Sequence, residues 1–233
     1  MKDIKLWIYD ETGAYTSYRE DSIISLKISR SMFKDGPAVG CCVSGKLEAV
    51  LYIPSESIIR NAKIIPFVRN AGGSWVQKST FFVYTRQIDH ITGVVSIIAY
   101  DAIYKAEAPM ITSGEVGSWP RSDVACMQEI ASRTGAAIDS SSIASMDRGY
   151  MIQFPGSVVA DENGTVDRRQ DGVTTMREIA GYVASMYAAN WVIDNAGNWR
   201  LIFLGDIPPY QLEDLLVDEL GNAIVIGGVR ILV

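Results

Sequence analysis

The sequence predicts an α+β protein that is mainly β, with a small N-terminal β-barrel or sandwich followed by an α+β module that contains two helices. Apolar and polar residues alternate with a period of two through most of the first hundred residues, which is typical of strands with one buried face. Beyond about residue 109, two segments show helical spacing instead. Of the 233 residues, 48% are hydrophobic and 21% charged, so the chain is long and apolar enough to bury a sizeable core.

Six strands are expected in the first region. The first, IKLWIY, alternates apolar with polar or aromatic residues, and the later segments repeat this pattern. Pro66 interrupts the fourth segment, which favours an edge strand or a bulge because proline has no N–H to donate. Residues 89–93 connect the last two segments as a hairpin, so the lone histidine, His90, is expected in a turn rather than in a catalytic site. The expected strands are 4–9, 23–29, 46–53, 63–69, 80–88 and 94–100.

Asp101 directly follows the last of these strands. We interpret it as the N-cap of a short helical turn at 102–105, because an aspartate carboxylate in that position accepts hydrogen bonds from free backbone N–H groups. A catalytic role would need a second reactive group, and the neighbouring sequence shows none. Asp101 is therefore expected to be structural.

Two helices are expected in the second region, at about 122–134 and 175–189. Gly135 fits the C-cap of the first helix, since glycine readily takes the left-handed conformation that ends many helices. The second helix begins with Thr175 and Glu178, three residues apart as in a capping box. Its apolar stripe is expected to consist of Ile179, Tyr182, Val183 and Met186.

The remaining segments of this region are expected to be loops, apart from a short strand at 150–154 and a hairpin at 190–204. The hairpin prediction depends on two apolar segments that flank the turn DNAGN. Loops are expected at 109–120, 139–149 and 161–172, which are rich in Gly, Ser, Pro or charged residues. The chain thus divides into a β-domain at 1–108, an α+β domain at 109–208 and the start of a further β-domain, cut short, at 209–233.

The charge and cysteine content limit the classes of partner. With a formal net charge of -6 and a pI near 4.9, the chain does not have the basic balance of a tight nucleic-acid clamp, although DNA could slide past an acidic surface without sticking. No apolar run is long enough for a transmembrane helix, and no signal peptide is visible at the N terminus. The three cysteines, Cys41, Cys42 and Cys126, are an odd number with two adjacent, so we expect small buried thiols and folding in a reducing compartment.

The sequence holds no recognised constellation of reactive residues. It lacks the Cys and His spacings of zinc sites, a phosphate-binding P-loop, a G-x-G-x-x-G after a strand and the G-x-S-x-G nucleophile motif. The chain has 27 acidic residues, but nothing marks two of them as a pair held at a fixed separation in a cleft. We therefore assign no catalytic, cofactor-binding or metal-binding residue.

The order of the segments resembles that of the central hub proteins of phage tails and of related contractile injection particles. The matching segments are SIISLKISRSM (22–32), GKLEAVLYIP (45–54), the hairpin at 79–107 with AYDA at 99–102, the helix and hairpin at 174–204, and AIVIGGVRILV (223–233). The positions that match the family pattern, with structural roles, are Phe82, Tyr100, Asp101, Gly197 and Gly227.

The resemblance implies a non-enzymatic structural subunit of a virion tail, assembled in the cytoplasm of the bacterial host. It implies a homo-oligomer, a trimer whose paired β-domains mimic six-fold symmetry and dock on the tail tube. The implied partners are the tail tube protein, the distal tail or baseplate ring proteins and the spike, with DNA passing through the lumen without specific binding. Members of this family continue into another β-domain, and this chain stops where that domain would begin.

Two other classes of function remain open at this point. A tail-associated hydrolase of cell-wall peptide or glycan is conceivable because hub proteins of this family can carry such domains. A receptor-binding or carbohydrate-binding module is the second alternative, since the chain has five Trp, eleven Tyr and a Gly-rich loop at 70–75. A cell-wall digestion assay and a glycan-binding assay distinguish these alternatives from a structural subunit.

Overall fold

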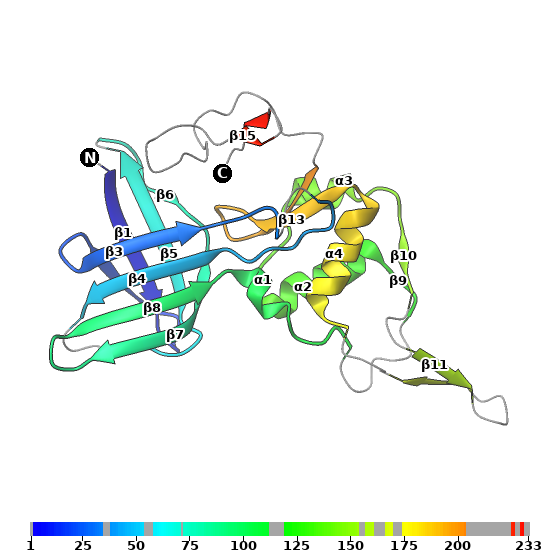
Figure 1. Ribbon diagram of the computed structural model, residues 1–233, viewed down its shortest axis with the longest axis horizontal. Coiled ribbons are helices and arrows are strands. Elements are labelled where there is room, and N and C mark those ends of the chain that lie inside the picture. Colours follow the sequence, from blue (N-terminus) through cyan, green and yellow to red (C-terminus); the bar gives the residue numbers. More distant parts are fainter. Residues whose placement is uncertain are drawn as a thin grey trace.

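The computed structural model describes residues 2–34, 38–53, 58–70, 72–111, 119–153, 157–160, 166–169, 174–203, 225–226 and 229–230. A large antiparallel sheet is formed by the N-terminal part of the chain, and the helices follow it in sequence and lie at one end of it (Figure 1). This arrangement confirms the prediction of a mainly β, α+β fold.

The sheet has eight strands in the order β2-β1-β5-β7-β8-β4-β3, with β6 paired to β5. In Figure 1 the strands β1 and β5 run steeply across β3, β4 and β8, so the sheet folds over on itself. Its end strands β2 and β3 are not paired with each other among the described residues. The strands are β1 (Lys2–Tyr9), β2 (Tyr15–Arg19), β3 (Ile23–Ser29), β4 (Lys46–Tyr52), β5 (Lys63–Asn70), β6 (Val76–Gln77), β7 (Phe81–Asp89) and β8 (Val94–Tyr100).

Alternate residues of these strands fill the interior of the folded sheet. Strand β4 buries Leu47, Ala49 and Leu51, while the residues between them are less buried. Together with Leu6 of β1 and Val95 of β8 they belong to one hydrophobic cluster, which we call the β core. The period of two in the sequence therefore decides which face of each strand is buried.

Strand β5 differs from its expected position at an edge, because it lies between β1 and β7. Pro66 nevertheless marks a change of neighbour: β5 pairs with β7 at Lys63 and Ile64, and its next partner on that side is β6, from Phe67 onward. The missing N–H of Pro66 thus falls where the hydrogen-bonding partner changes. Strand β2 is also present, although no strand was expected there.

The second part of the chain contains four helices and several short hairpins among the described residues. Strand β13 (Ala189–Ile193) pairs with β14 (Trp199–Phe203), as the turn DNAGN predicts. The helices are α1 (Ala102–Lys105), α2 (Asp123–Thr134), α3 (Ser140–Ser145) and α4 (Met176–Met186). The remaining antiparallel pairs are β9 (Arg121–Ser122) with β10 (Met151–Ile152), β11 (Ser157–Ala160) with β12 (Val166–Arg169), and β15 (Val225–Ile226) with β16 (Val229–Arg230).

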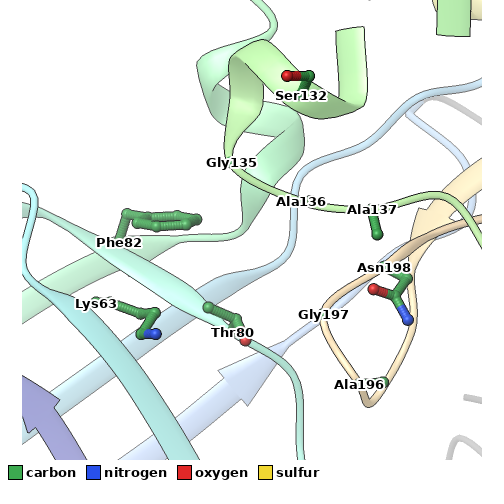
Figure 2. Close-up of a pocket in the computed structure, with 10 residues that line it drawn as sticks. All are labelled: Lys63, Thr80, Phe82, Ser132, Gly135, Ala136, Ala137, Ala196, Gly197 and Asn198. Atoms are coloured by element: carbon green, nitrogen blue, oxygen red, sulfur yellow. The ribbon is translucent and has the colours of Figure 1, made fainter. Parts of the chain in front are cut away.

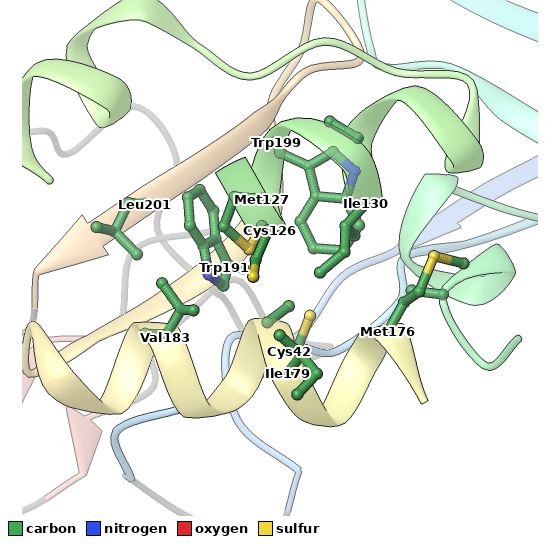
Figure 3. Packing of buried hydrophobic residues seen from close by; sticks show 14 of the residues in the cluster. Cys42, Cys126, Met127, Ile130, Met176, Ile179, Val183, Trp191, Trp199 and Leu201 are labelled. Atoms are coloured by element: carbon green, nitrogen blue, oxygen red, sulfur yellow. The ribbon is translucent and has the colours of Figure 1, made fainter. Parts of the chain in front are cut away.

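Helices α2 and α4 and the hairpin β13–β14 enclose a second hydrophobic cluster, which we call the mixed core. Figure 3 shows the rings of Trp191 and Trp199 at its centre, with Val183 approaching from α4. Cys42 and Cys126 are buried in the same cluster, and Cys41 is half-buried. All three cysteines are free thiols, as expected from their count and spacing.

The predicted helix caps are confirmed. Asp101 accepts a hydrogen bond from the Ile103 backbone N–H and forms the N-cap of α1. Gly135 takes the left-handed conformation at the end of α2. Thr175 and Glu178 form both hydrogen bonds of a capping box at the start of α4.

Other expectations about this region are wrong. Residues 140–145 form helix α3 rather than a loop, with Asp139 as its N-cap. Residues 166–169, expected in a charged loop, pair as strand β12. Within the expected loop 109–120, Met110 and Trp119 are buried in the mixed core.

The predicted apolar stripe of α4 is also wrong in part. Tyr182 is 62% exposed, and the buried face instead includes Ala180 and Ala184. Small residues face the core because α4 packs closely against the rest of the chain: Gly181 lies against the backbone of Gly40, where a Cβ would come within 2.8 Å of the Gly40 carbonyl oxygen. Most of the expected C-terminal β-domain, including Gly227, lies outside the described residues.

Candidate functional site at the junction of the two cores

The region in which the β core meets the mixed core is built from segments that cross from one to the other. Residues 38–45 connect β3 to β4, yet they run alongside β13. The Gly40 N–H donates to the Ala189 carbonyl (2.8 Å), and the Trp191 N–H donates to the Cys41 carbonyl (3.0 Å). A segment between two strands of the sheet therefore extends into the mixed core and brings Cys42 with it.

Asn190 holds this segment in place with its side chain. Its Oδ1 accepts from the Cys41 N–H at 2.7 Å, and its Nδ2 donates to the Ala38 carbonyl at 2.9 Å. The side chain is fully buried, so both hydrogen bonds replace contacts that water would otherwise provide. Asn190 thus joins β13 to the connection between β3 and β4.

The turn between β13 and β14 extends in the opposite direction, toward the sheet. The Ser79 N–H donates to the Asn195 carbonyl (2.9 Å), and Arg30 donates to the Asn195 side chain (3.1 Å) and to the Lys78 carbonyl (3.1 Å). The Gln77 side chain donates to the Ala196 carbonyl (3.1 Å). Each half of the molecule therefore inserts a segment into the other, which resists separation in either direction.

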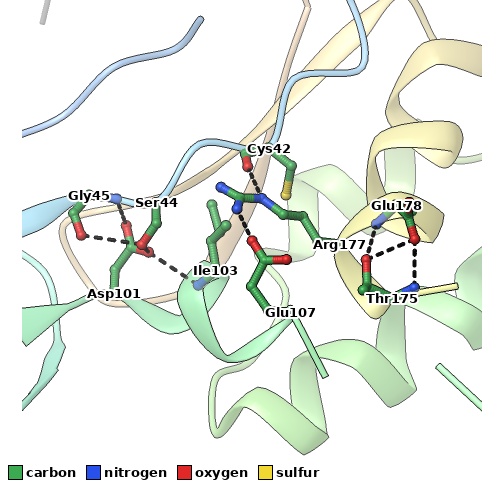
Figure 4. Close-up of polar contacts among 9 residues, drawn as sticks. All are labelled: Cys42, Ser44, Gly45, Asp101, Ile103, Glu107, Thr175, Arg177 and Glu178. Atoms are coloured by element: carbon green, nitrogen blue, oxygen red, sulfur yellow. Dashed lines mark hydrogen bonds and ion pairs between the residues drawn. The ribbon is translucent and has the colours of Figure 1, made fainter. Parts of the chain in front are cut away.

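Asp101 lies at the centre of this junction (Figure 4). Its carboxylate accepts from the Ser44 hydroxyl (2.9 Å), the Gly45 N–H (2.7 Å) and the Ile103 N–H (3.1 Å). Burial raises the pKa of Asp101 to about 6, although these hydrogen bonds and the nearby Arg30 charge act in the opposite direction. A Cβ at Gly45 would come within 2.8 Å of the carboxylate, so this close approach requires glycine.

Arg177 makes a second connection across the junction. Its Nε donates to the Cys42 carbonyl at 2.7 Å, and its guanidinium forms an ion pair with Glu107 (Figure 4). Its backbone N–H donates to the Ala106 carbonyl at 2.8 Å. One residue of α4 therefore contacts both the segment 38–45 and the end of α1.

A cleft of about 440 Å³ opens between β7, the end of α2 and the turn between β13 and β14 (Figure 2). Phe82 lies on one side of it and Gly197 on the other. The Lys105 ammonium lies 3.2 Å from the centroid of the Phe82 ring, and burial lowers the pKa of Lys105. Gly197 has a positive φ of 91°, and a Cβ there would come within 2.6 Å of the Thr80 hydroxyl.

The cleft is lined by few polar side chains, one of which is the amide of Asn198. The described residues that line it provide one ammonium, Lys63, and the hydroxyls of Thr80 and Ser132, but no carboxylate and no imidazole. No group of three or more potential metal ligands exists among the described residues.

Four of the five positions that match the family pattern lie at this junction. Phe82 and Gly197 line the cleft, and Asp101 connects Ser44 and Gly45 to α1. Tyr100 is opposite Phe82 in the sheet, and its ring stacks on Tyr104 at 4.9 Å between centroids. Gly227 lies outside the described residues. Sequence reasoning missed Asn190 and the segment 38–45, because their contacts join residues about 150 positions apart.

No helix of the described part of the chain is both long and apolar enough to span a bilayer.

The exposed imidazole of His90 lies in the turn of the hairpin β7–β8, as expected, and Asp89 accepts the hydrogen bonds of that turn.

The sequence matches no protein-family model and no curated protein. Among solved structures, the chain is similar to the 43 kDa tail protein of prophage MuSo2 from Shewanella oneidensis, with a TM-score of 0.50 and 13% identity over 86% of this chain and 54% of that one. It also aligns with the tail protein from Neisseria meningitidis MC58 (TM-score 0.48, 9% identity, 96% of this chain and 53% of that one). A third alignment is with prophage tail protein gp18 from Listeria monocytogenes EGD-e (TM-score 0.44, 10% identity, 92% and 55%).

At 13% identity, the likeness to the Shewanella protein shows a shared fold. The chain spans about half the length of each of these three proteins.

Proposed function

We propose that this chain is a non-enzymatic structural subunit of a phage or phage-like tail, and that it forms the central hub of the baseplate or tail tip. The observation that carries the proposal is the fold shared with a prophage tail protein over 86% of the chain. Because a fold alone does not define a function, the proposal also depends on the segment order described above and on the construction of the junction.

The junction supports a mechanical role. Reciprocal insertions, a buried asparagine and a buried aspartate join the two cores through hydrogen bonds with fixed geometry. A subunit that transmits position between tube and tip needs such a connection, whereas an enzyme would place reactive groups around its cleft. We propose that the residues singled out by the family resemblance have structural roles at this junction. They are Phe82, Tyr100, Asp101 and Gly197.

The two cores support a domain division near the one expected from the sequence. We propose the boundary at about residue 108: the β core ends at Ala99, and the mixed core begins with Ala102 and Ile103 of α1, apart from Cys42. The β-domain at 1–108 would contact neighbouring copies, the α+β domain at 109–208 would support it, and residues 209–233 would begin a further β-domain. The segment 38–45 is the exception, since it belongs to the first domain in sequence and packs on the second.

The assembled form is proposed to be a homotrimeric ring between the tail tube and the spike, surrounded by distal tail or baseplate ring proteins. A net charge of -6 suits a ring through which DNA passes, since an acidic lumen repels phosphate. Its location would be the virion tail, after assembly in the cytoplasm of the bacterial host.

Sedimentation equilibrium with negative-stain imaging tests this proposal. The expected result is a closed ring of three copies at protein concentrations approaching those of assembly. A protein that stays monomeric over the whole accessible concentration range would contradict it.

The hydrolase alternative is tested on the same preparation by cell-wall digestion, and we expect no activity. The two buried carboxylates of the described residues are already engaged, Asp101 as above and Asp123 with the Tyr187 hydroxyl at 2.5 Å. Digestion that disappears on replacing a single carboxylate would overturn the structural assignment. Glycan binding by the isolated chain would favour the receptor-binding alternative.

A further inference from the structure

The outer surface of the sheet carries a group of aromatic and cationic side chains that is unrelated to the junction. Residues of β1 alternate between the β core, which holds Leu6 and Ile8, and this outer surface, which holds Lys5 and Trp7. We call the group the Lys5 cluster, and it consists of Lys5, Trp7, Arg19, Phe67, Arg69 and Trp75.

The cations of the cluster are arranged unfavourably for the isolated chain. Lys5 is directly opposite Arg19 in the pairing of β1 with β2, and like charges in directly opposed positions destabilise a sheet. Arg69 forms an ion pair with Asp3 at 2.6 Å. The carboxylate of Glu20, which follows Arg19 in the sequence, accepts a hydrogen bond from the Ile4 N–H and forms no ion pair with Lys5. Burial and the charges of Arg19 and Arg69 all lower the pKa of Lys5.

These cations, and for Trp7 also the stacked ring of Tyr15 at 4.4 Å between centroids, already contact the aromatic rings of the cluster. The Lys5 ammonium lies 4.8 Å from the ring centroid of Trp7, 4.7 Å from that of Phe67 and 4.6 Å from that of Trp75. The Arg69 guanidinium lies 4.6 Å from the centroid of Trp75. A sugar or a nucleobase binds by stacking on a free ring face, so this arrangement does not favour either of them.

The three aromatic residues and two arginines of the cluster are of types enriched at protein–protein interfaces, whereas lysine is depleted there. The cluster contains three cations, and Asp3 is the carboxylate paired with one of them, Arg69. This local excess of positive charge contrasts with the net charge of -6 of the whole chain. A partner that brings carboxylates would relieve the repulsion between Lys5 and Arg19 and would be held by charge-assisted hydrogen bonds.

We propose that the Lys5 cluster is a docking surface for an acidic polypeptide segment of a partner protein. Carboxylates of that segment contact Lys5 and Arg19, and its apolar groups pack against the edges of Trp7 and Trp75. This inference depends on the geometry of the outer surface and not on the assignment of the chain to a phage tail. The two can therefore fail separately.

Fluorescence anisotropy with a labelled polyglutamate peptide tests the proposal, with oligothymidylate and polygalacturonate as competing polyanions. The proposal predicts saturable polyglutamate binding that weakens as salt is raised and exceeds binding of either competitor. The double variant Lys5→Gln/Arg19→Gln is expected to bind at least about tenfold more weakly. The matched control Lys27→Gln/Arg86→Gln removes two exposed cations elsewhere on the same sheet and should bind like the unmodified chain.

A second measurement keeps the test informative if a variant folds poorly. Removing one member of the like-charged pair with Arg19→Gln should leave the melting temperature unchanged or raise it by about 1–3 °C. Equal binding by the cluster variant and its control, tighter binding of oligothymidylate or polygalacturonate, or a melting temperature lowered by Arg19→Gln would each overturn the proposal.

Discussion

The β core and the mixed core of this protein are held together by different interactions. The β core consists mostly of apolar side chains from alternating strand positions, and Tyr18 adds a phenol to it. The mixed core has two tryptophans at its centre, and polar groups bond inside it: Thr134 accepts from Trp199 Nε1 at 3.0 Å, and Ser142 accepts from the Leu201 N–H at 2.9 Å. Burial of apolar area is sufficient for the first core, whereas the second also requires specific partners.

The largest expected effect comes from removing a side chain that both fills the mixed core and donates a hydrogen bond. Trp199→Ala should lower the free energy of unfolding by about 3–5 kcal/mol, because it leaves a cavity and removes the hydrogen bond that Thr134 accepts, while the Thr134 hydroxyl still donates to the backbone of α2. Urea denaturation measures it. In the β core, the volume-conserving change Leu47→Met should cost less than about 1.5 kcal/mol. Equal losses for the two variants would contradict the contrast between the cores.

Asp101 gives the junction a dependence on pH. Its pKa is about 6 in the folded chain and 3.8 when unperturbed, so the folded state binds more protons between these values. Its contribution to stability is therefore greatest below about pH 4 and is lost as the pH rises through 6, by about 3 kcal/mol in all. Urea denaturation of the native chain and of Asp101→Asn at several pH values checks this. The difference between the two should change over that window, and parallel profiles would refute the assignment.

Asn190 tests the connection between the cores. Asn190→Ala leaves the Cys41 N–H and the Ala38 carbonyl without their partner, which should cost about 2–3 kcal/mol. The exposed Asn70 is the control, and Asn70→Ala should change the stability by less than about 0.5 kcal/mol. The connection would be unimportant if thermal denaturation showed the same melting temperature for both variants.

The capping box of α4 should have a smaller, local effect. Thr175→Ala removes one of its two hydrogen bonds and should cost about 1 kcal/mol, while Thr175→Ser should retain most of the stability. Helix content and urea midpoint measure the pair. A serine variant as unstable as the alanine variant would show that the hydroxyl does not matter.

The smallest effect is expected at Tyr182, whose ring is 62% exposed. Tyr182→Ser should change the free energy of unfolding by less than about 0.5 kcal/mol. Ile179→Ala, on the buried face of the same helix, should cost about 2–5 kcal/mol. Similar losses at the two positions would restore the stripe that the sequence predicted.

The contrast between the cores also explains what could be predicted from the sequence. Strand positions such as Leu47 and Leu51 follow from a local alternation, and the caps at Gly135 and Thr175 follow from local hydrogen bonding. The helical spacing of the large residues places Tyr182 on the stripe of α4, but the same spacing also fits a face that includes Ala180 and Ala184, and that face is the buried one.

The junction could not be predicted in the same way. Asn190 looks like an ordinary strand residue, and its partners Ala38 and Cys41 are in another part of the sequence. Asp101 was recognised as a cap, but its contacts with Ser44 and Gly45 depend on the path of the chain between β3 and β4. Such long-range polar contacts leave no periodic signal in one sequence.

Native-state hydrogen exchange tests most directly whether the two unlike cores behave as one body, which the proposed structural role requires. The amide of Leu47 reports on the β core, and that of Leu201, which donates to the Ser142 hydroxyl, reports on the mixed core. If the junction couples them, both amides exchange only by global unfolding, with opening free energies equal to within about 1 kcal/mol. A mixed core that opens at clearly lower free energy while the sheet stays protected would contradict the account.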